Sequence, residues 1–461
     1  MKKLLLFLTL ITFIVSGCDI ANFDEDINKN PNLPSDAAPS VLIANAMLSL
    51  PALSSSPLGE YYAQYLSQLI YVDQSLYPKE TTSFYWMYQG PLINLQKAIN
   101  DTENANEAAV AKILKAYYFW NITDRWGDIP YSEALKGEGN FTPAYDAQKD
   151  IYYSLFDSLK AAVNQLDPGG LLNNDIMYNG NINKWRKFGN TVRMLMALRL
   201  SEVDEQKAQQ EFKSALSDGV MESNDDSFVF QHLDNQDNEN YWFDQIVRQT
   251  RVWWAIPVRL IEMMEPYDDP RLSVYANKAE KTDTFNGLPY GSPIEEVSTP
   301  SEYSLLGSAI YEQDAPVYLT TYAQAEFAIA EAAARKWTNE DPKAHYDKAV
   351  EASIAQWTGS EDGAVQLLQK QPFDPTQPIE QIANQRYIHL FMFGYEAWAE
   401  YRRTGFPDNM VKPNGREIPR RLAYPDDEKL NNTEHFKEAL ERQFNDEDNN
   451  SIYGRIWWDA D

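Results

Sequence analysis

Cysteine is almost absent, because the 461-residue chain contains only one, Cys18. An internal disulfide is therefore excluded, and the 44% of hydrophobic residues must build the core by packing alone. Basic residues are also few, with 40 Lys and Arg against 68 Asp and Glu and a formal net charge of −28. Such a surface repels phosphate backbones, which excludes nucleic acid as a favoured partner, and it repels acidic polymers unless a local patch is basic.

Sequence patterns of catalysis are missing as well. The four histidines are scattered without zinc-binding spacing, and the chain has no nucleophile elbow, Walker loop or dinucleotide-binding glycine pattern. Two carboxylates suffice for glycoside hydrolysis, but 68 acidic residues offer too many pairs for any one to be informative. The Asp- and Asn-rich loop 234–240 lacks the calcium-binding EF-hand pattern. The sequence therefore predicts no enzyme, no cofactor and no metal site.

Long apolar runs are confined to the N-terminus. Residues 4–15 are apolar and follow two lysines, but they are too few to cross a bilayer, which needs about 20 residues. Two small residues and then Cys18 follow, an order typical of a lipoprotein signal. We predict a signal peptide at 1–17 and an acylated tether at 18–40, since acyl chains on Cys18 hold a protein stably to a membrane. The alternative is an ordinary secreted protein with an incidental thiol.

Periodicity and composition divide the remaining chain. Apolar residues recur at helical spacing from about residue 41 to 216 and again from 315 to 403. Residues 220–316 are richer in Asn, Asp, Gly, Pro and Thr, which indicates loops with short strands. The chain is therefore mostly helical, with a loop-rich part between two helical blocks.

The second helical block contains a helical hairpin. Residues 322–337 and 342–357 each carry one apolar face, and the turn between them is only a few residues long. Asp341 is a suitable N-cap for the second helix. A third helix is predicted from 379 to 403, ended by Gly405 in a left-handed cap.

Six segments of the chain together resemble one known family: Asn28 to Asn32, Arg125 to Ala134, Lys184 to Asn190, Asp268 to Arg271, Glu396 to Pro407 and Arg420 to Pro425. The most specific, Glu396 to Pro407, resembles a signature near the C-terminus of SusD/RagB-like outer-membrane lipoproteins, with closest similarity to the second SusD-like subfamily. Each segment alone is weak, but together they span essentially the mature chain in the family's order.

The resemblance implies four tetratricopeptide-like helix pairs as a scaffold, with a loop-rich half packed on it. Residues 41–461 are then a single SusD-like domain, of which 220–316 is the loop-rich part. It further implies a cell-surface lipoprotein of a Bacteroidetes-type bacterium that captures oligosaccharides and delivers them to a SusC-like TonB-dependent outer-membrane transporter. Peptide ligands, a helical-repeat adaptor without small ligand, and a periplasm-facing lipoprotein are the alternatives.

A neutral glycan requires aromatic rings that stack on the apolar faces of its sugars, together with a few hydrogen-bonding groups. Loop aromatics are better candidates than helix aromatics, which we expect to pack in the core. We predict Tyr71, Tyr77, Trp242 and Tyr290 as ligand-binding residues, the first two following a helix expected at 60–70.

Other loop aromatics are weaker candidates, and each could instead be a core residue. They are Tyr241, Phe243, Trp253 and Trp254, with Arg251 nearby. The tryptophans expected to pack on helix faces are Trp120, Trp185, Trp337, Trp357 and Trp398.

Overall fold

Helices dominate the computed structural model, which describes residues 37–79, 82–292 and 299–460. Residues 39–461 form one compact unit. The predicted signal peptide, Cys18 and the tether up to residue 36 lie outside the described residues.

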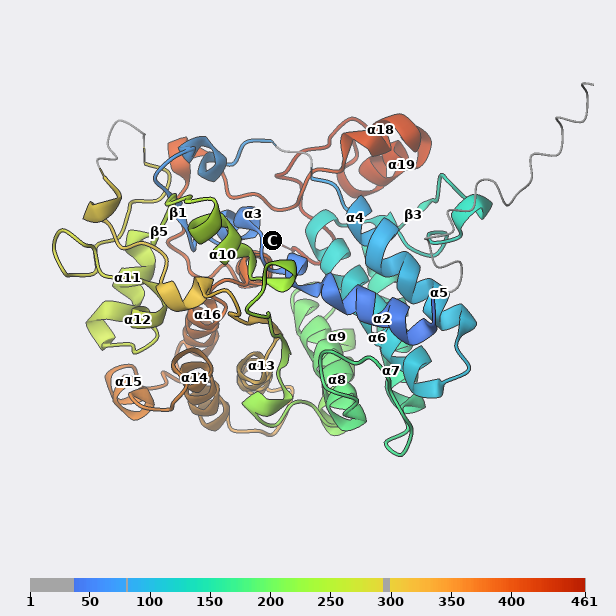
Figure 1. Cartoon of the computed structure of the whole chain (residues 1–461), viewed down its shortest axis with the longest axis horizontal. Helices are drawn as coiled ribbons and strands as arrows, with labels where there is room; N and C mark the ends of the chain where they lie inside the picture. Colours follow the sequence, from blue (N-terminus) through green and yellow to red (C-terminus); the bar gives the residue numbers. More distant parts are fainter. Residues whose placement is uncertain (1–36, 80–81, 293–298, 461) are drawn as a thin grey trace, which may run out of the picture. The chain divides into compact units, whose positions relative to one another are not determined.

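The first helical block builds one side of this unit (Figure 1). Helices α6 and α7 pack as one antiparallel pair and α8 and α9 as another, while α2 and α5 cover α6. The helices of this block are α2 (Pro39–Leu48), α4 (Tyr85–Met87), α5 (Ile93–Asp101), α6 (Ala105–Trp126), α7 (Gln148–Gln165), α8 (Ile182–Arg199) and α9 (Glu205–Ser217). Helix α3 (Pro57–Tyr62) instead packs in the other half, against α17 (Gly394–Thr404).

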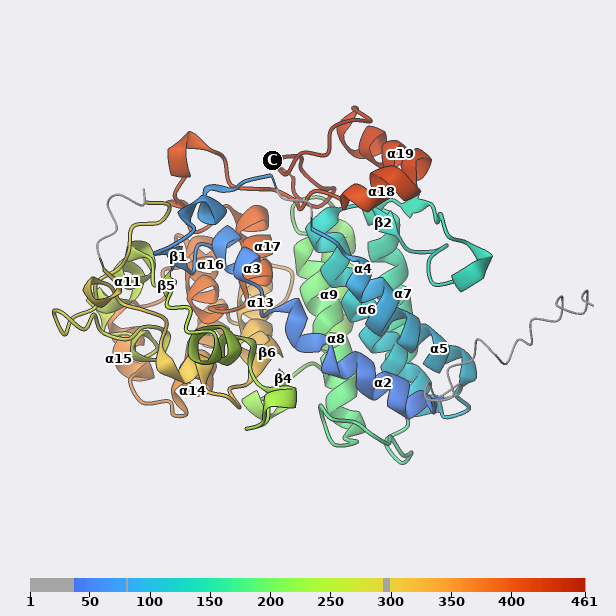
Figure 2. The same ribbon diagram turned by 45° about the horizontal axis from the view of Figure 1, so that its top comes forward.

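The second block packs beside the first through contacts between α13 and α8 (Figure 2). Its helix pairs complete the mostly helical, tetratricopeptide-like architecture that the family resemblance implied. Its helices are α13 (Tyr322–Ala334), α14 (Pro342–Thr358), α15 (Ala364–Lys370), α16 (Pro378–His389) and α17 (Gly394–Thr404), and α18 (Asp426–Asn431) and α19 (Thr433–Phe444) follow.

Short strands, short helices and loops complete the unit, and the loop-rich part lies between the two helical blocks in the sequence. The described strands make three antiparallel two-stranded ribbons, β1 with β5, β2 with β3, and β4 with β6. The short helices are α10 (Tyr241–Phe243), α11 (Val258–Met264) and α12 (Leu272–Tyr275). The strands are β1 (Ser67–Gln68), β2 (Ile129–Pro130), β3 (Tyr145–Asp146), β4 (Phe228–Phe230), β5 (Trp254–Ala255) and β6 (Val317–Thr320).

Capping residues explain where the hairpin helices begin and end. The side chain of Asp341 accepts a hydrogen bond from the Lys343 N–H at the start of α14, as the sequence predicted. Thr321 and Gln324 form a reciprocal capping box at the start of α13. Gly405 ends α17 with a φ of +76°, a left-handed conformation that glycine adopts without steric cost.

The prediction of one continuous helix from 379 to 403 is wrong. The structure has two helices there, α16 and α17, separated by a turn in which Met392 has a φ of +62°. The break lets the start of α17 contact α3 directly. The two backbones are so close that a Cβ on Gly394 would lie only 2.1 Å from the Gly59 carbonyl carbon, so only glycine fits there. This contact joins residues far apart in sequence, so helical periodicity alone could not reveal it.

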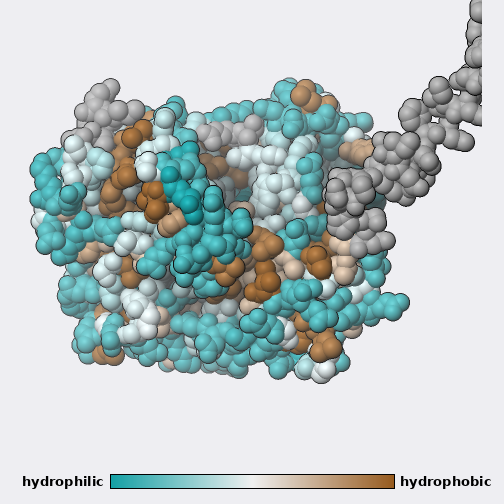
Figure 3. Space-filling view, in the orientation of Figure 1, coloured by the Kyte–Doolittle hydropathy of each residue, from teal (hydrophilic) through white to brown (hydrophobic). Residues whose placement is uncertain are grey.

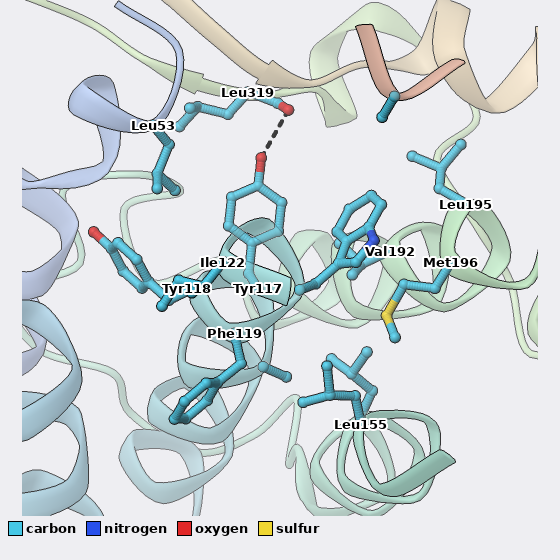
Figure 4. Packing of buried hydrophobic residues seen from close by; sticks show 14 of the residues in the cluster. Leu53, Tyr117, Tyr118, Phe119, Ile122, Leu155, Val192, Leu195, Met196 and Leu319 are labelled. Atoms are coloured by element: carbon cyan, nitrogen blue, oxygen red, sulfur yellow. Dashed lines mark hydrogen bonds between the residues drawn. The ribbon is translucent and has the colours of Figure 1, made fainter. Parts of the chain in front are cut away.

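The main core is continuous across both helical blocks. In Figure 4, Tyr117 of α6 points toward β6, and its hydroxyl donates a 2.8 Å hydrogen bond to the Leu319 carbonyl. Leu155 of α7 and Met196 of α8 pack nearby. Four of the five tryptophans expected to pack on helix faces are buried, and Trp357 is partly buried.

A group of buried charges, which we call the interior ion-pair network, links α6 and α8 to α13, α16 and α17. Arg199 binds Glu396 at 2.7 Å and Glu400 at 2.5 Å, and Arg403 binds Glu331 at 2.7 Å and Glu400 at 2.6 Å. Arg386 also contacts both Glu331 and Glu400. The members are Asp124, Arg199, Glu331, Arg386, Glu396, Glu400 and Arg403.

The network shifts the titration of its own carboxyl groups. Burial alone raises the pKa of Glu400, but the Arg403, Arg386 and Arg199 charges outweigh it and hold that pKa at about 2. The pKa of Glu331 is likewise well below its ordinary value, because Arg403 and Arg386 outweigh the effect of burial. Most of the Glu396 to Arg403 signature therefore builds the interior.

Of the helices in the described ranges, none is by itself long and apolar enough to cross a bilayer. One bent pair, Pro39–Leu48 with Leu50–Tyr62, meets the length and composition criterion jointly, with a bend of 41°.

Candidate functional site

An aromatic pair lies at the surface where β1 and β5 meet. Gln68 pairs with Trp254 in the ribbon, and the Leu69 N–H donates a 2.8 Å hydrogen bond to the Trp253 carbonyl. This pairing brings Tyr71 and Trp253 together, with ring centroids 5.0 Å apart in an edge-to-face arrangement.

The surroundings of this pair are apolar and open. Tyr71 is 52% exposed, Ile70 47% and Val252 42%, while Trp253 is half-buried. The Arg251 guanidinium lies 4.8 Å from the centre of the Trp253 ring and donates a hydrogen bond to the Gln245 side chain. We call Ile70, Tyr71, Arg251, Val252 and Trp253 the aromatic edge. Figure 3 shows hydrophobic residues gathered over β1 and β5, at the upper left of that face.

A row of rings continues from the aromatic edge into the interior. The Trp253 and Trp254 centroids are 5.6 Å apart, and those of Trp254 and Trp242 are 5.1 Å apart. The Trp254 indole N–H donates a 2.8 Å hydrogen bond to the Tyr61 hydroxyl, which fixes the ring. Since Trp254 is 4% exposed and Trp242 3%, the row joins an exposed pair to two buried tryptophans.

Trp242 also lines a cavity of about 200 Å³, together with Tyr318, Trp357 and Phe393. Asn240, at its edge, is occupied structurally, since its side chain accepts from the Trp242 N–H and donates to the Ala315 carbonyl. The cavity therefore offers mainly an apolar wall, suited to a small apolar group of a ligand.

The structure separates the four predicted ligand-binding residues. Tyr71 is at the surface and Trp242 is at the cavity, whereas Tyr77 and Tyr290 are buried side by side, with 1% and 7% exposure and centroids 6.2 Å apart. The Tyr290 hydroxyl donates to the Tyr61 carbonyl, and burial raises the pKa values of Tyr77 and Tyr290 well above the ordinary range. Because both rings are buried in the structure, neither offers a face on which a sugar could stack.

The prediction of a helix at 60–70 is wrong beyond Tyr62, and the early end of the helix explains part of this separation. Helix α3 ends at Tyr62, Gln64 has a φ of +57°, and the chain then enters β1. A short 3-10 segment, η2 (Val72–Leu76), follows, with Tyr71 as its N-cap and Tyr77 as its C-cap. Tyr77 accepts a 2.6 Å hydrogen bond from Gln64 and thereby fixes the segment that displays Tyr71.

Trp253 is the residue that sequence reasoning undervalued. In the sequence it is only one of several loop aromatics. Alternation along β5 would not single it out, because both residues of that strand, Trp254 and Ala255, are buried and Trp253 precedes it.

Further cavities lie elsewhere in the unit, and two of them bear on the argument. One of about 390 Å³ is lined by amides and carboxylates between α11, α16 and the 407–409 loop. The other, of about 230 Å³, lies among α5, α6 and α7. Within the described ranges, no group of three or more His, Cys, Asp or Glu side chains has an arrangement that could hold a metal ion.

Comparison with known proteins identifies one family whose members resemble this chain in sequence and in fold. A SusD-like family model, described as starch-binding and associating with the outer membrane, matches residues 31–425. Among solved structures, a chitin-binding protein matches with a TM-score of 0.82 and 28% identity, over 92% of this chain and 100% of that chain. A search of curated proteins gives no significant match.

Two structures from Bacteroides show the same similarity. A SusD homologue from Bacteroides fragilis matches with a TM-score of 0.82 and 27% identity, over 92% of this chain and 100% of that one. An outer membrane protein from Bacteroides vulgatus, described in connection with nutrient binding, matches with a TM-score of 0.83 and 26% identity over the same shares.

Proposed function

The chain belongs to the SusD-like family, and on that premise we propose that it captures oligosaccharides at the outer membrane and delivers them to a SusC-like TonB-dependent transporter. The observation that carries the binding role is the exposed Tyr71–Trp253 pair. Two exposed or half-exposed rings at one surface, beside apolar and polar groups, are what an uncharged sugar requires. The family is described by what it binds, which agrees with a non-enzymatic role.

We propose that Tyr71 and Trp253 form the stacking surface and that Arg251 donates hydrogen bonds to sugar hydroxyls. Arg251 already lies over the Trp253 ring, so its guanidinium is placed at the rim of that surface. Trp242 contributes through the cavity that it lines, and Tyr77 and Tyr290 contribute by holding the η2 segment in place.

The first ligand class to test is the N-acetylated, chitin-type oligosaccharide. One of the similar structures is described as chitin-binding, and the apolar cavity beside Trp242 would suit the methyl of an acetamido group. Starch-type oligosaccharides are the second class, following the family description. Acidic polymers are disfavoured at this site by the net charge of −28.

Titration of intrinsic tryptophan fluorescence with chitin, starch and acidic oligosaccharides and with mixed peptides tests the binding role. We expect a saturable response to one neutral glycan, weakened about five- to tenfold in Trp253→Ala, since a ring contact contributes about 1 kcal/mol. Trp86→Ala is the matched control, because Trp86 is 37% exposed but lies on α4, away from β1 and β5 (Figures 1 and 2).

Other results would replace the glycan proposal. A response to peptides alone would favour the peptide-capturing alternative. If no ligand in the panel gives a response while the chain still co-purifies with an outer-membrane barrel, it acts as an adaptor. Equal losses in Trp253→Ala and Trp86→Ala would remove the aromatic edge as the site.

We propose that residues 1–17 are removed as a signal peptide, that acyl chains on Cys18 and the tether 18–40 attach the chain to the membrane, and that 41–461 is the binding domain facing the cell exterior. The lone cysteine after an apolar run supports this arrangement. Labelling of growing cells with a radioactive fatty acid should mark the wild-type chain and leave Cys18→Ser unlabelled. Protease added to intact cells should digest the chain if it faces outward.

A further inference from the structure

The cavity among α5, α6 and α7 differs from the rest of this acidic protein. Its volume is about 230 Å³, and we call it the scaffold pocket. In Figures 1 and 2 these helices lie on the other side of the unit from β1 and β5, so the pocket is separate from the aromatic edge. The residues used below are Gln96 of α5, Lys112, Lys115 and Phe119 of α6, Tyr131, and Ser158 of α7.

The charged side chains that line the scaffold pocket are both lysines, in a chain with 68 acidic residues. The Lys112 ammonium donates a 2.8 Å hydrogen bond to Gln165, and the Lys115 ammonium donates a 2.6 Å hydrogen bond to Gln96. Neither amine forms an ion pair with a carboxylate of the described residues. Two cations thus share one pocket and are bound only to neutral amide oxygens.

Lys115 is the more desolvated of the two. It is partly buried, its ammonium lies 5.9 Å from the centre of the Phe119 ring, and burial lowers its pKa. A partly buried cation without a counter-ion loses hydration energy that a carboxylate partner would restore. The pocket is therefore suited to an anionic group supplied from outside.

The walls of the pocket suggest what carries that group. Phe119 and Tyr131 meet edge to face with centroids 4.8 Å apart, and Gln96 and Ser158 add polar groups near them. Phe119 is fully buried and only supports the neighbouring ring, so the half-buried Tyr131 is the aromatic side chain that can face the C–H side of a sugar ring, while the amide and hydroxyl suit its hydroxyls. The net charge of −28 repels a polyanion, so one carboxylate is favoured over many.

We propose that the scaffold pocket binds a single hexuronate unit, with its carboxylate between Lys112 and Lys115 and its ring against Tyr131. This site is independent of the proposed neutral-glycan site. A glycan with one uronate unit could therefore be held by the scaffold while its neutral units are held elsewhere or by another copy.

Saturation-transfer NMR and calorimetry with sodium glucuronate on the purified protein test this proposal, with methyl glucoside and N-acetylglutamate as comparison ligands. We expect saturable binding of glucuronate, a tenfold or greater rise of Kd in Lys115→Gln and Lys112→Gln, and little binding of either comparison ligand. Lys160→Gln on the exposed face of α7 is the charge-matched control and should bind as the wild type does. Trp253→Ala should leave glucuronate binding unchanged.

Several results would overturn the proposal. These are the absence of saturable glucuronate binding, equal binding of methyl glucoside, equal binding of N-acetylglutamate, or an affinity that neither lysine variant changes. Loss of glucuronate binding in Trp253→Ala would move the uronate to the aromatic edge. Circular dichroism and thermal melting establish that each variant is folded, and if Lys115→Gln is not, Lys112→Gln decides the question.

Discussion

The interior ion-pair network and the aromatic edge place opposite kinds of side chain where each is usually least expected. The network holds guanidinium and carboxylate groups inside the unit, with Arg199 and Arg403 almost fully buried. The aromatic edge leaves Tyr71 and Val252 in solvent. Buried charges are retained when each is paired, and exposed rings are retained when something binds them.

This contrast separates the part of the sequence that holds the fold from the part that we propose binds a ligand. The network uses residues of the family signature, Glu396 to Arg403, and joins five helices. The aromatic edge depends on a short ribbon, β1 with β5, and on the loops beside it. Substitutions in the network should therefore change stability, and substitutions at the edge should change affinity.

The largest expected effect is a loss of folding stability in Arg403→Met. Removal of this guanidinium leaves Glu331 and Glu400 with fewer partners in the interior, and breaking a buried pair in this way costs about 3–5 kcal/mol. Denaturant unfolding should show the loss, while the folded variant keeps its affinity for glycan. Lys343→Ala is the control, because its pair with Asp347 is exposed and should contribute less than about 1 kcal/mol. A loss for Arg403→Met no larger than that of the control would contradict the role of the network.

The next effect concerns Glu60, a buried carboxyl without the cations that the network provides. One of its oxygens accepts from the Gly394 N–H, and the other has no partner among the described residues. Burial raises its pKa from 4.5 to about 8. Between these values the folded state keeps a proton that the unfolded state has lost, so stability falls as pH rises, by up to about 1.4 kcal/mol per pH unit.

The substitution Glu60→Gln should remove this slope. Melting temperatures of the wild type and the variant at pH 5, 6.5 and 8 measure this slope. The melting temperature of the variant should rise relative to that of the wild type as pH rises. A difference between the two melting temperatures that stays constant over this range would show that Glu60 does not titrate there.

The network should respond to acid in the opposite sense. The pKa of Glu400 is about 2 in the folded state against an ordinary value of 4.5, so its contribution is present above pH 4.5 and is lost as pH falls toward 2. Acid unfolding followed by circular dichroism should shift to higher pH in Glu400→Gln if the paired charge resists protonation. An unchanged acid midpoint would assign acid unfolding to other carboxyl groups.

The smallest effect is the coupling between the two rings of the aromatic edge. Tyr71→Ala and Trp253→Ala should each weaken glycan binding by about 1 kcal/mol. Because the two ring centroids are only 5.0 Å apart, the loss in the double variant should differ from the sum of the two single losses. Calorimetric titration of all four proteins gives this coupling. Strict additivity would mean that each ring contacts the ligand independently.

Much of the fold could be predicted from the sequence, because helical periodicity and capping are local signals. The hairpin of α13 and α14, the Asp341 cap and the Gly405 cap all follow from neighbouring residues. The break between α16 and α17 could not be predicted, because the contact of Gly394 with Gly59 that it allows joins residues far apart in the sequence. The same limit applies to the surface, since Tyr71 meets Trp253 only through a ribbon between distant segments.

The backbone conformation of the η2 segment has a consequence for how substitutions can raise the thermal stability of this chain. Tyr71 and Tyr77 both adopt left-handed conformations, with φ of +60° and +54°, which cost a tyrosine on the order of 1 kcal/mol each. Asparagine or glycine would relieve that strain. A selection for heat resistance alone would thus tend to replace Tyr71 and erase the ring that a ligand needs, whereas a natural population that keeps tyrosine there reveals selection for binding.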